Sequence, residues 1–201
     1  MNKLVLVRHG ESIFNRDNKI AGRINVDLTD EGKKQAKETG ILLSEMEFSA
    51  VYTSTLNRAK ETARIILEQN LKTNIFPFAF SEMNEQYFGE IEGADKSDLT
   101  EKFGAEKVLA WRRSFDVCPP EGESFADLVK RSSAFFEKNV KQNLEKGNIL
   151  LVGHGNWMRS LAFYLEKIPK EKLSHFEFEN ARARVYTCNS NFEIINAAFI
   201  D

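Results

Sequence analysis

The chain has 201 residues, of which 42% are hydrophobic and 29% are charged. This length and composition are typical of a globular protein with one hydrophobic core, and no stretch has the composition of a linker. We therefore expect a single domain over residues 1–201. The 28 basic and 30 acidic side chains give a net charge of −2, so electrostatics favour neither nucleic acid nor an anionic membrane as a partner.

The sequence also predicts where the protein works. The apolar run that follows Lys3 is too short for the core of a signal peptide, and no apolar stretch is long enough to span a bilayer. Cys118 and Cys188 lie far apart and form no paired motif, which suits a reducing compartment better than a disulfide scaffold. We expect a soluble cytoplasmic protein.

Strand and helix patterns alternate in the first part of the chain. Residues 4–7 form a short apolar run rich in β-branched side chains, which predicts a buried strand. Thr29 is a favourable N-cap for the helix that follows it. Residues 50–52 predict a second strand, and residues 57–69 predict an amphipathic helix.

The middle of the chain is less regular. Residues 76–122 contain several glycines and prolines, with short helical patterns at 97–103 and 105–113. Irregular segments of this kind often carry binding residues. Ser124, followed by an acidic residue three positions later, resembles a capping box and predicts a helix that runs to about residue 145.

The last third of the chain returns to short strands. Residues 149–152 predict a second strongly buried strand, and residues 157–166 predict a helix. Residues 176–178, 184–187 and 192–195 have the pattern of antiparallel edge strands. The alternation of strands and helices predicts an α/β fold, a three-layer α/β/α sandwich with a mostly parallel sheet.

The sequence contains three histidines, and two of them, His9 and His154, occur in the same setting of an apolar strand, then His, then Gly. The carboxyl ends of parallel strands share one edge of the sheet, where ligands bind. The two histidines therefore meet if their strands are neighbours. Each glycine removes a side chain beside its histidine, so a ligand can approach the backbone. The alternative is two strand-end histidines that only hydrogen-bond to a loop.

The neighbourhood of the histidines favours an anion over a metal ion. Neither histidine has an Asp, Glu or Cys at ligand spacing, and Arg8 beside His9 would repel a cation, so no metal site is predicted. Arginine has a planar fork suited to phosphate oxygens. A neutral imidazole is a competent nucleophile toward phosphorus, and a second, protonated histidine can stabilise charge during the transfer.

Other polar residues could complete a phosphate site. Arg58 lies at the start of a predicted helix, after a turn rich in hydroxyl groups, where anions are favoured. Asn15 and Asn156 lie close in sequence to the two histidines, although each could equally be a turn residue. Phosphoryl transfer also needs a proton donor, and Glu82 and Glu85 are candidates that could instead be solvated loop residues.

Together, these motifs resemble the histidine phosphatase superfamily. In chain order, they are Arg8-His9-Gly10-Glu11, the block Thr53-Ser54…Arg58-Ala59…Thr62-Ala63, Glu85…Gly89, and Gly153-His154-Gly155. Within the superfamily, the chain looks most like the cofactor-dependent phosphoglycerate mutases, through residues 84–89, 93–96, 103–104 and 111–116. These enzymes interconvert 3- and 2-phosphoglycerate through a phosphohistidine that is primed by 2,3-bisphosphoglycerate.

The resemblance implies a role for each matching residue. His9 would be the nucleophile, His154 its charge-stabilising partner, and Glu85 the general acid and base. Arg8, Arg58, Asn15 and Asn156 would surround the transferred phosphoryl group, and the remaining substrate-binding positions would be Gly22, Tyr87, Lys96, Arg112 and Arg113. The last four would grip the carboxylate and second phosphate of the substrate. The resemblance also implies a small phosphorylated acid as substrate. The sequence itself does not predict the oligomeric state, but mutases of this type are often dimers or tetramers, so a homodimer is one possible assembly.

Two features are closer to phosphatase relatives. Only residues 117–122 separate the last mutase-like segment from Glu123-Ser124, where mutases carry a longer segment. Residues 179–185 also lack the Pro-Thr-Gly turn that is usual in mutases. The alternative function is therefore a phosphatase of the same phosphohistidine type, acting on small phosphomonoesters or sugar phosphates. A module that binds phosphate esters without turnover is a third hypothesis.

Overall fold

The computed structural model describes residues 1–189 and 193–200. In this part of the chain, a six-stranded sheet has the order β3-β2-β4-β1-β5-β6. The strands are β1 (Lys3–Arg8), β2 (Phe48–Ser54), β3 (Phe78–Phe80), β4 (Asn148–Gly153), β5 (Ala183–Cys188) and β6 (Ile194–Ile200). The first four strands in chain order run parallel to one another, whereas β5 is antiparallel to its neighbours β1 and β6. The predicted α/β fold with a mostly parallel sheet is confirmed.

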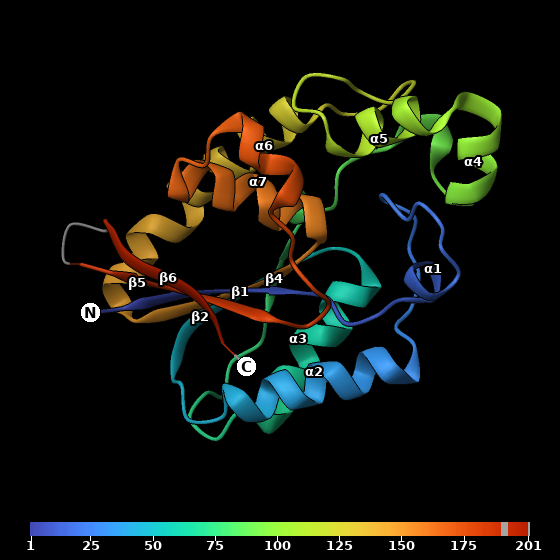
Figure 1. Cartoon of the computed structure of the whole chain (residues 1–201). Helices are drawn as coiled ribbons and strands as arrows, with labels where there is room; N and C mark the ends of the chain where they lie inside the picture. The colour runs from blue at the N-terminus through green and yellow to red at the C-terminus, as the bar shows by residue number, and fades with distance from the viewer. Residues whose placement is uncertain (190–192, 201) are drawn as a thin grey trace.

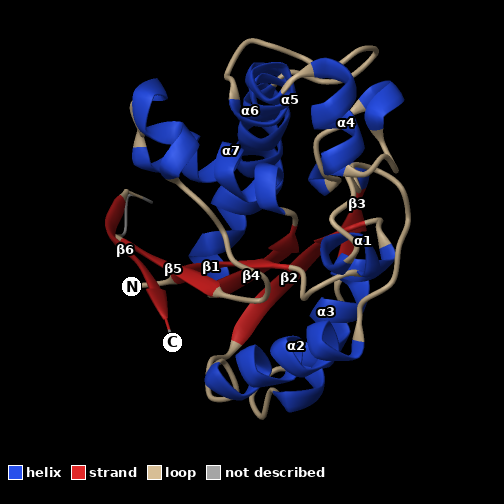
Figure 2. Cartoon of the chain, turned by 45° about the vertical axis from the view of Figure 1, so that its right-hand side comes forward, coloured by secondary structure: helices blue, strands red, loops and turns tan. Residues whose placement is uncertain are grey.

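Helices cover both faces of the sheet (Figure 1). Helices α2 (Asp30–Leu42) and α3 (Asn57–Gln69) lie on one face. Helices α6 (Phe125–Phe135) and α7 (Gly155–Glu166) lie on the other, as Figure 2 also shows. The sequence predicted the bounds of α3 and the N-cap at Thr29, whose hydroxyl accepts a hydrogen bond from the backbone N–H of Gly32.

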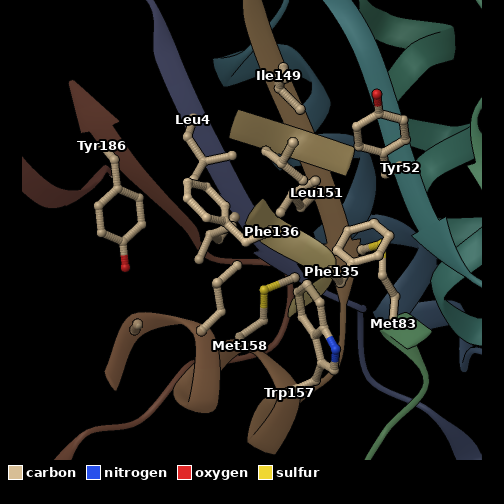
Figure 3. Packing of buried hydrophobic residues seen from close by; sticks show 14 of the residues in the cluster. Leu4, Tyr52, Met83, Phe135, Phe136, Ile149, Leu151, Trp157, Met158 and Tyr186 are labelled. Carbon is tan, nitrogen blue, oxygen red and sulfur yellow. The ribbon is translucent and has the colours of Figure 1, made fainter. Parts of the chain in front are cut away.

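The alternation of side chains along the central strands makes two hydrophobic clusters. Leu4 and Leu6 of β1 belong to the cluster under α6 and α7, where they pack with Trp157 (Figure 3). Val5 and Val7 belong to the cluster on the opposite face, under α2 and α3. All four β1 side chains are at most 1% exposed, so both faces of the strand that leads to His9 are held by packing.

A third cluster lies apart from the sheet. It contains Ile20, Phe88, Leu99 and Trp111, and it supports two short helices, α4 (Lys96–Phe103) and α5 (Ala105–Arg113). These helices agree with the two predicted for the irregular middle. The described residues also contain a four-residue helix α1 (Ile13–Arg16) and short 3₁₀ segments at Ser81–Met83, Gly89–Ile91 and Lys170–His175.

The helix that begins at Phe125 changes pitch, which the sequence did not predict. After α6, the chain continues as a π-helical turn over Phe136–Val140 and a 3₁₀ segment over Lys141–Lys146. Phe136, Val140 and Leu144 are all buried and recur every four residues. In an α-helix of 3.6 residues per turn, side chains four residues apart move gradually away from one face. The wider π turn keeps these side chains directed toward the sheet.

The prediction of an edge strand at residues 176–178 was wrong. These residues form an irregular segment whose carbonyls are taken by arginine side chains instead of a neighbouring strand: Phe176 O accepts from Arg159 and Phe178 O from Arg8. The strands predicted at 184–187 and 192–195 correspond to β5 and to the start of β6. Phe192 itself lies outside the described residues.

Candidate active site

The two strand-end histidines lie side by side because β1 and β4 are parallel neighbours. Arg8 is paired with Gly153 in the register of these strands, so His9 and His154 each follow the last pair by one residue. The backbone N–H of His9 continues the ladder by donating to Gly153 O at 2.9 Å. The two ring centroids are 5.2 Å apart, and His9 is 4% exposed. The condition set by the sequence pattern, that their strands be neighbours, is met.

The hydrogen bonds of His9 define its protonation. Nδ1 lies 2.7 Å from the carbonyl oxygen of Gly10, which can only accept, so Nδ1 carries the proton. Nε2 is therefore the nitrogen with the lone pair, and it accepts from Nε of Arg58 at 3.2 Å. Burial, with the charges of Arg58 and Arg8, holds the pKa of His9 well below its ordinary value. The imidazole is thus neutral, as nucleophilic attack requires.

Arg58 is fixed between His9 and the loop at residues 22–24. Its Nη1 donates to Ile24 O at 2.8 Å and its Nη2 to Gly22 O at 2.7 Å, and the residue is only 1% exposed. Burial lowers the pKa of Arg58 to about 10, which leaves it charged at neutral pH. Gly22 has a φ of 48°, and a Cβ there would overlap the carboxylate of Glu92, so this turn requires glycine.

Gly10 and Gly155, the glycines after the two histidines, serve different purposes. A Cβ on Gly10 would lie 2.2 Å from the carbonyl oxygen of Gly32, so Gly10 allows its loop to pack against the start of α2. Gly10 does not line the cavity, whereas Gly155 does. The expectation that each glycine opens space for a ligand therefore fits only Gly155.

His154 is completely buried and is held from behind by Ser54. Its Nε2 lies 2.7 Å from the hydroxyl of Ser54, which also accepts from the N–H of Leu56 at 3.2 Å. Its Nδ1 is buried without a partner among the described residues. Burial, then Arg58 and the neighbouring His9, hold the pKa of His154 well below its ordinary value. A protonated partner was predicted from the sequence, whereas this lowered pKa favours the neutral imidazole.

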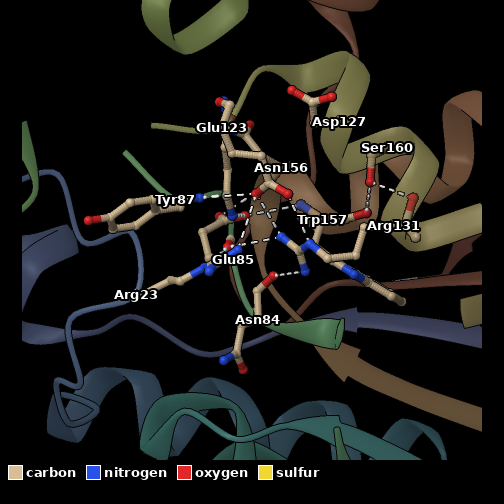
Figure 4. A network of polar contacts seen from close by, with 12 residues as sticks. Arg23, Asn84, Glu85, Tyr87, Glu123, Asp127, Arg131, Asn156, Trp157 and Ser160 are labelled. Atoms are coloured by element: carbon tan, nitrogen blue, oxygen red, sulfur yellow. Dashed lines mark hydrogen bonds and ion pairs between the residues drawn. The ribbon is translucent and has the colours of Figure 1, made fainter. Parts of the chain in front are cut away.

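Glu85 lies at the N-terminus of α7 (Figure 4). Its Oε1 accepts from the N–H of Gln86 at 2.9 Å and of Trp157 at 3.1 Å, and its Oε2 accepts from the N–H of Asn156 at 3.2 Å. Two of these N–H groups belong to the first turn of the helix, where they lack partners within the helix and where the dipole favours a carboxylate. The carboxylate is thereby oriented at the mouth of the site.

Arg131 of α6 fixes the loop that carries Glu85, a role that was not predicted from the sequence. Its Nε and Nη2 bind the two carboxylate oxygens of Glu123 at 3.0 and 2.8 Å. Its Nη1 donates to the carbonyl oxygens of Glu82 at 2.7 Å and Asn84 at 2.8 Å. In sequence, Arg131 is one more charged residue on an amphipathic helix, where a solvated role is the ordinary expectation.

An open cavity of about 650 Å³ joins these groups to the α4–α5 region. Ten of the predicted residues line it: Arg8, His9, Asn15, Gly22, Arg58, Glu85, Lys96, Arg112, Arg113 and Asn156. His154 does not, because it lies behind His9 with 0% exposure. Tyr87 does not line it either, since its ring packs 5.2 Å from the guanidinium of Arg23. The cavity therefore gathers all predicted site residues except these two.

The far end of the cavity, formed by Lys96, Arg112 and Arg113, is strongly basic. Burial and then the charge of Arg112 lower the pKa of Lys96, and burial and then Arg113 lower that of Arg112. Nζ of Lys96 donates to Oδ1 of Asn18 at 3.3 Å. Cations held close together in this way are stabilised by an anion, so the far end is suited to a negatively charged group.

The cavity also contains residues that sequence reasoning missed, notably Lys19 and Glu177. Glu177 forms an ion pair with Arg113 at 2.7 Å. The pattern Phe176-Glu177-Phe178 has the alternation of a strand, and the edge strand predicted there assigned no role to Glu177. Lys19 lies in a loop, where its sequence context offers no signal.

The described residues also bear on metals and membranes. Within 1–189 and 193–200, no group of three or more His, Cys, Asp or Glu side chains is arranged to hold a metal ion. No helix in the described part of the chain combines the length and apolar character needed to cross a membrane.

Residues 4–198 match the histidine phosphatase superfamily (branch 1). The chain belongs to this superfamily. It is 36% identical over 199 residues to a 2,3-bisphosphoglycerate-dependent phosphoglycerate mutase of Cytophaga hutchinsonii, with 98% of this chain and 92% of the relative covered. It is 34% identical over 203 residues to a phosphoglycerate mutase of Schizosaccharomyces pombe, with 100% of this chain and 96% of the relative covered.

The fold is also similar to solved structures. A phosphoserine phosphatase of Entamoeba histolytica, solved in complex with 3-phosphoglyceric acid, superimposes with a TM-score of 0.81 and 28% identity. The superposition covers 100% of this chain and 98% of that one. The relatives of this histidine phosphatase superfamily enzyme thus include both mutases and phosphatases.

Proposed function

We propose that the chain is a phosphoglycerate mutase that interconverts 3- and 2-phosphoglycerate through a phosphohistidine on His9. The observation that carries the proposal is the second group of cations, Lys96, Arg112 and Arg113, in the same cavity as His9. Phosphoglycerate has a phosphate at one end and a carboxylate at the other, so it needs cations at both ends of its site. Hydrolysis of a simple phosphomonoester would need only the first group, beside His9.

In this mechanism, phosphohistidine at His9 reacts with a hydroxyl of bound phosphoglycerate. The hydroxyl oxygen forms a bond to phosphorus, the bond from phosphorus to Nε2 of His9 breaks, and the hydroxyl proton passes to the carboxylate of Glu85. In the return transfer, Nε2 attacks the other phosphoryl group, and the leaving oxygen takes the proton back from Glu85. The phosphoryl group thereby moves between the two carbon positions with no net gain or loss of protons.

The surrounding groups stabilise the transferred phosphoryl oxygens. Arg8 and Arg58 supply fixed positive charge, and Nδ1 of His154 is free to donate a hydrogen bond. When bound, 2,3-bisphosphoglycerate would supply the phosphoryl group that first charges His9. The end of the cavity beside His9 fits one phosphoryl group of this primer, because Nε of Arg8 and Nδ1 of His154 are buried without a partner within the described residues. Arg112 and Arg113 would hold its other end.

A phosphatase for small phosphomonoesters or sugar phosphates is the second candidate, with water as the acceptor. It is favoured by the ion pair of Glu177 with Arg113, which reduces the positive charge offered to a second anionic group. The short segment at 117–122 does not decide between the two. A Schizosaccharomyces pombe protein named phosphoglycerate mutase is matched over 96% of its length by this chain, so it can be little longer.

The deciding experiment follows the fate of the phosphoryl group. Purified protein is incubated with 3-phosphoglycerate and a trace of 2,3-bisphosphoglycerate, and the products are quantified by ³¹P NMR. We expect 2-phosphoglycerate to accumulate to equilibrium faster than free phosphate. Free phosphate without 2-phosphoglycerate would exclude the mutase and support the phosphatase. The His9→Gln variant, run in parallel, should form neither product.

A further inference from the structure

The segment that carries Glu177 is fixed on both sides by arginines, the buried Arg159 and the partly buried Arg8. The carbonyl oxygen of Phe176 accepts from Nε of Arg159 at 2.7 Å, and that of Phe178 accepts from Nη1 of Arg8 at 2.8 Å. Arg159 is completely buried and also donates to Leu173 O at 2.7 Å. Because the backbone is held on either side of it, Glu177 has little freedom to leave the cavity that it lines.

Glu177 is unusual in the charge pattern of this cavity. Among the described lining residues, the cations are Arg8, Lys19, Arg58, Lys96, Arg112 and Arg113, and the acids are Glu85 and Glu177 alone. The carboxylate of Glu85 is already occupied by backbone N–H groups at the start of α7. Oε1 of Glu177 instead forms an ion pair with Nη2 of Arg113, at 2.7 Å. The far end of the cavity therefore carries a built-in anion.

A ligand with a negative charge at its far end must share Arg113 with this carboxylate. The two anions either compete for the same guanidinium or lie beside each other, and both arrangements cost more as the charge on the ligand rises. The cost is moderate, since the side chains of Arg113 and Glu177 are 24% and 45% exposed and water screens the contact. A ligand whose far end carries hydroxyl groups does not compete for Arg113, so Glu177 affects it only through the longer-range effect of the carboxylate on Arg8.

We propose that Glu177 is a specificity-determining residue that disfavours a second phosphate at the far end of the cavity. Glu177 ranks ligands by the charge at their far end: binding is weakened least for an uncharged end, more for a carboxylate and most for a phosphate. This inference rests on the proposed function only in using the same cavity. It holds whether the phosphoryl acceptor is a hydroxyl or water.

The test measures binding without turnover. Isothermal titration calorimetry in the His9→Gln background compares three ligands: 2,3-bisphosphoglycerate, 3-phosphoglycerate and glycerol 3-phosphate. Glu177→Gln should tighten binding of the bisphosphate by about three- to tenfold, with a smaller gain for 3-phosphoglycerate. Binding of glycerol 3-phosphate should change least, because Glu177 acts on it only through Arg8. The gain should shrink as salt is added, because the contact is partly exposed.

Three controls make the result specific. Glu179→Gln makes the same substitution two residues away, where the side chain is 73% exposed and pairs with Arg182. It should leave the affinity for all three ligands unchanged. Glu177→Asp keeps the charge and should keep the wild-type order of affinities. In an Arg113→Ala background, Glu177→Gln should lose most of its effect on the bisphosphate, because the contested guanidinium is gone.

The outcomes separate this inference from the proposed function. An equal gain for all three ligands, or no gain for the bisphosphate, would overturn the role of Glu177. Failure to form 2-phosphoglycerate in the turnover assay would exclude the mutase but would leave the graded binding result intact. A variant that fails to fold would be recognised by its thermal melting curve. If Glu177→Gln does not fold, Glu177→Asp and Arg113→Ala, measured with the same three ligands, would test the role of the ion pair.

Discussion

The two ends of the cavity are built in different ways. At the near end, His9 and His154 follow adjacent parallel strands whose side chains are packed on both faces. At the far end, Arg112 and Arg113 lie on α5, which rests on a small hydrophobic cluster of its own, and Glu177 lies on an irregular segment. The near end is thus determined by the sheet and the far end by structures attached to it.

This difference separates chemistry from selectivity. Phosphoryl transfer depends on the position of Nε2 of His9 to within fractions of an ångström, and only a packed sheet edge gives that constancy. Charge at the far end acts over longer distances and tolerates looser placement. Substitutions at the near end should therefore affect every substrate alike, and substitutions at the far end should affect substrates according to their charge.

The largest effect is expected for His9→Gln. Glutamine is similar in size and can still donate to Gly10 O, but it offers no nucleophilic nitrogen. Activity should fall by roughly 10⁴-fold or more on every phosphomonoester, whatever its far end. Wild-type protein treated with ³²P-labelled donor should carry an acid-labile, base-stable phosphoryl group that the variant lacks. Labelling of the variant to the wild-type level would show that another residue is the nucleophile.

Much of the near end could be predicted from the sequence, because it depends on local patterns. The strand-His-Gly setting occurs twice, and parallel strands bring such ends together without any knowledge of packing. The bounds of α3 followed from amphipathic periodicity. The roles of Glu85 and of Lys96 needed the family resemblance, since an isolated Glu or Lys in an irregular segment carries no positional information of its own.

The parts that escaped prediction depend on contacts between distant segments. Glu177 lies in a segment predicted as an edge strand, yet Arg8 of β1 and Arg159 of α7 donate to the carbonyls on either side of it. Arg131 looked solvated, yet it binds the loop that carries Glu85. Both cases reflect arginine side chains that satisfy backbone carbonyls of irregular segments, and such pairing leaves no periodic trace in the sequence.

A smaller effect at the near end is expected for Ser54→Ala. The Ser54 hydroxyl accepts from Leu56 N–H, so its own hydrogen is available to Nε2 of His154. This arrangement keeps the proton of His154 on Nδ1, directed away from Ser54. Without it, kcat should fall by about 10- to 100-fold, somewhat less than the loss of a direct transition-state donor, with KM nearly unchanged.

Ser54 would act by positioning His154, so its test needs a readout of the imidazole itself. Long-range ¹H–¹⁵N NMR spectra should show the Nδ1-protonated tautomer of His154 in the wild type and a mixture in Ser54→Ala. Ser160→Ala is the matched control, since Ser160 is an equally buried serine that binds Ser132 and the carbonyl of Trp157. A fall in kcat without a tautomer change would contradict the positioning role.

The smallest effect concerns stability against acid, and it also distinguishes the two ends. In the folded state, the pKa values of His9 and His154 lie well below the ordinary value of 6.5. As the pH falls below about 6.5, the unfolded chain binds protons at these positions while the folded chain does not. The free energy of unfolding therefore decreases as the pH is lowered, and neither histidine contributes to this dependence above that pH.

The expected slope is about 1.4 kcal/mol per pH unit for each buried imidazole below pH 6.5. Carboxylates across the molecule add to the total slope, so the informative quantity is the difference between the wild type and His9→Gln. In urea unfolding between pH 5 and 8, the free energy of unfolding of His9→Gln should depend less steeply on pH below 6.5, by the contribution of one buried imidazole. Glu177→Gln should keep that contribution. An unchanged slope in His9→Gln would mean that His9 is charged in the folded protein. The near end would then lack its neutral nucleophile, and the contrast between a buried, uncharged reaction centre and a charged far end would fail.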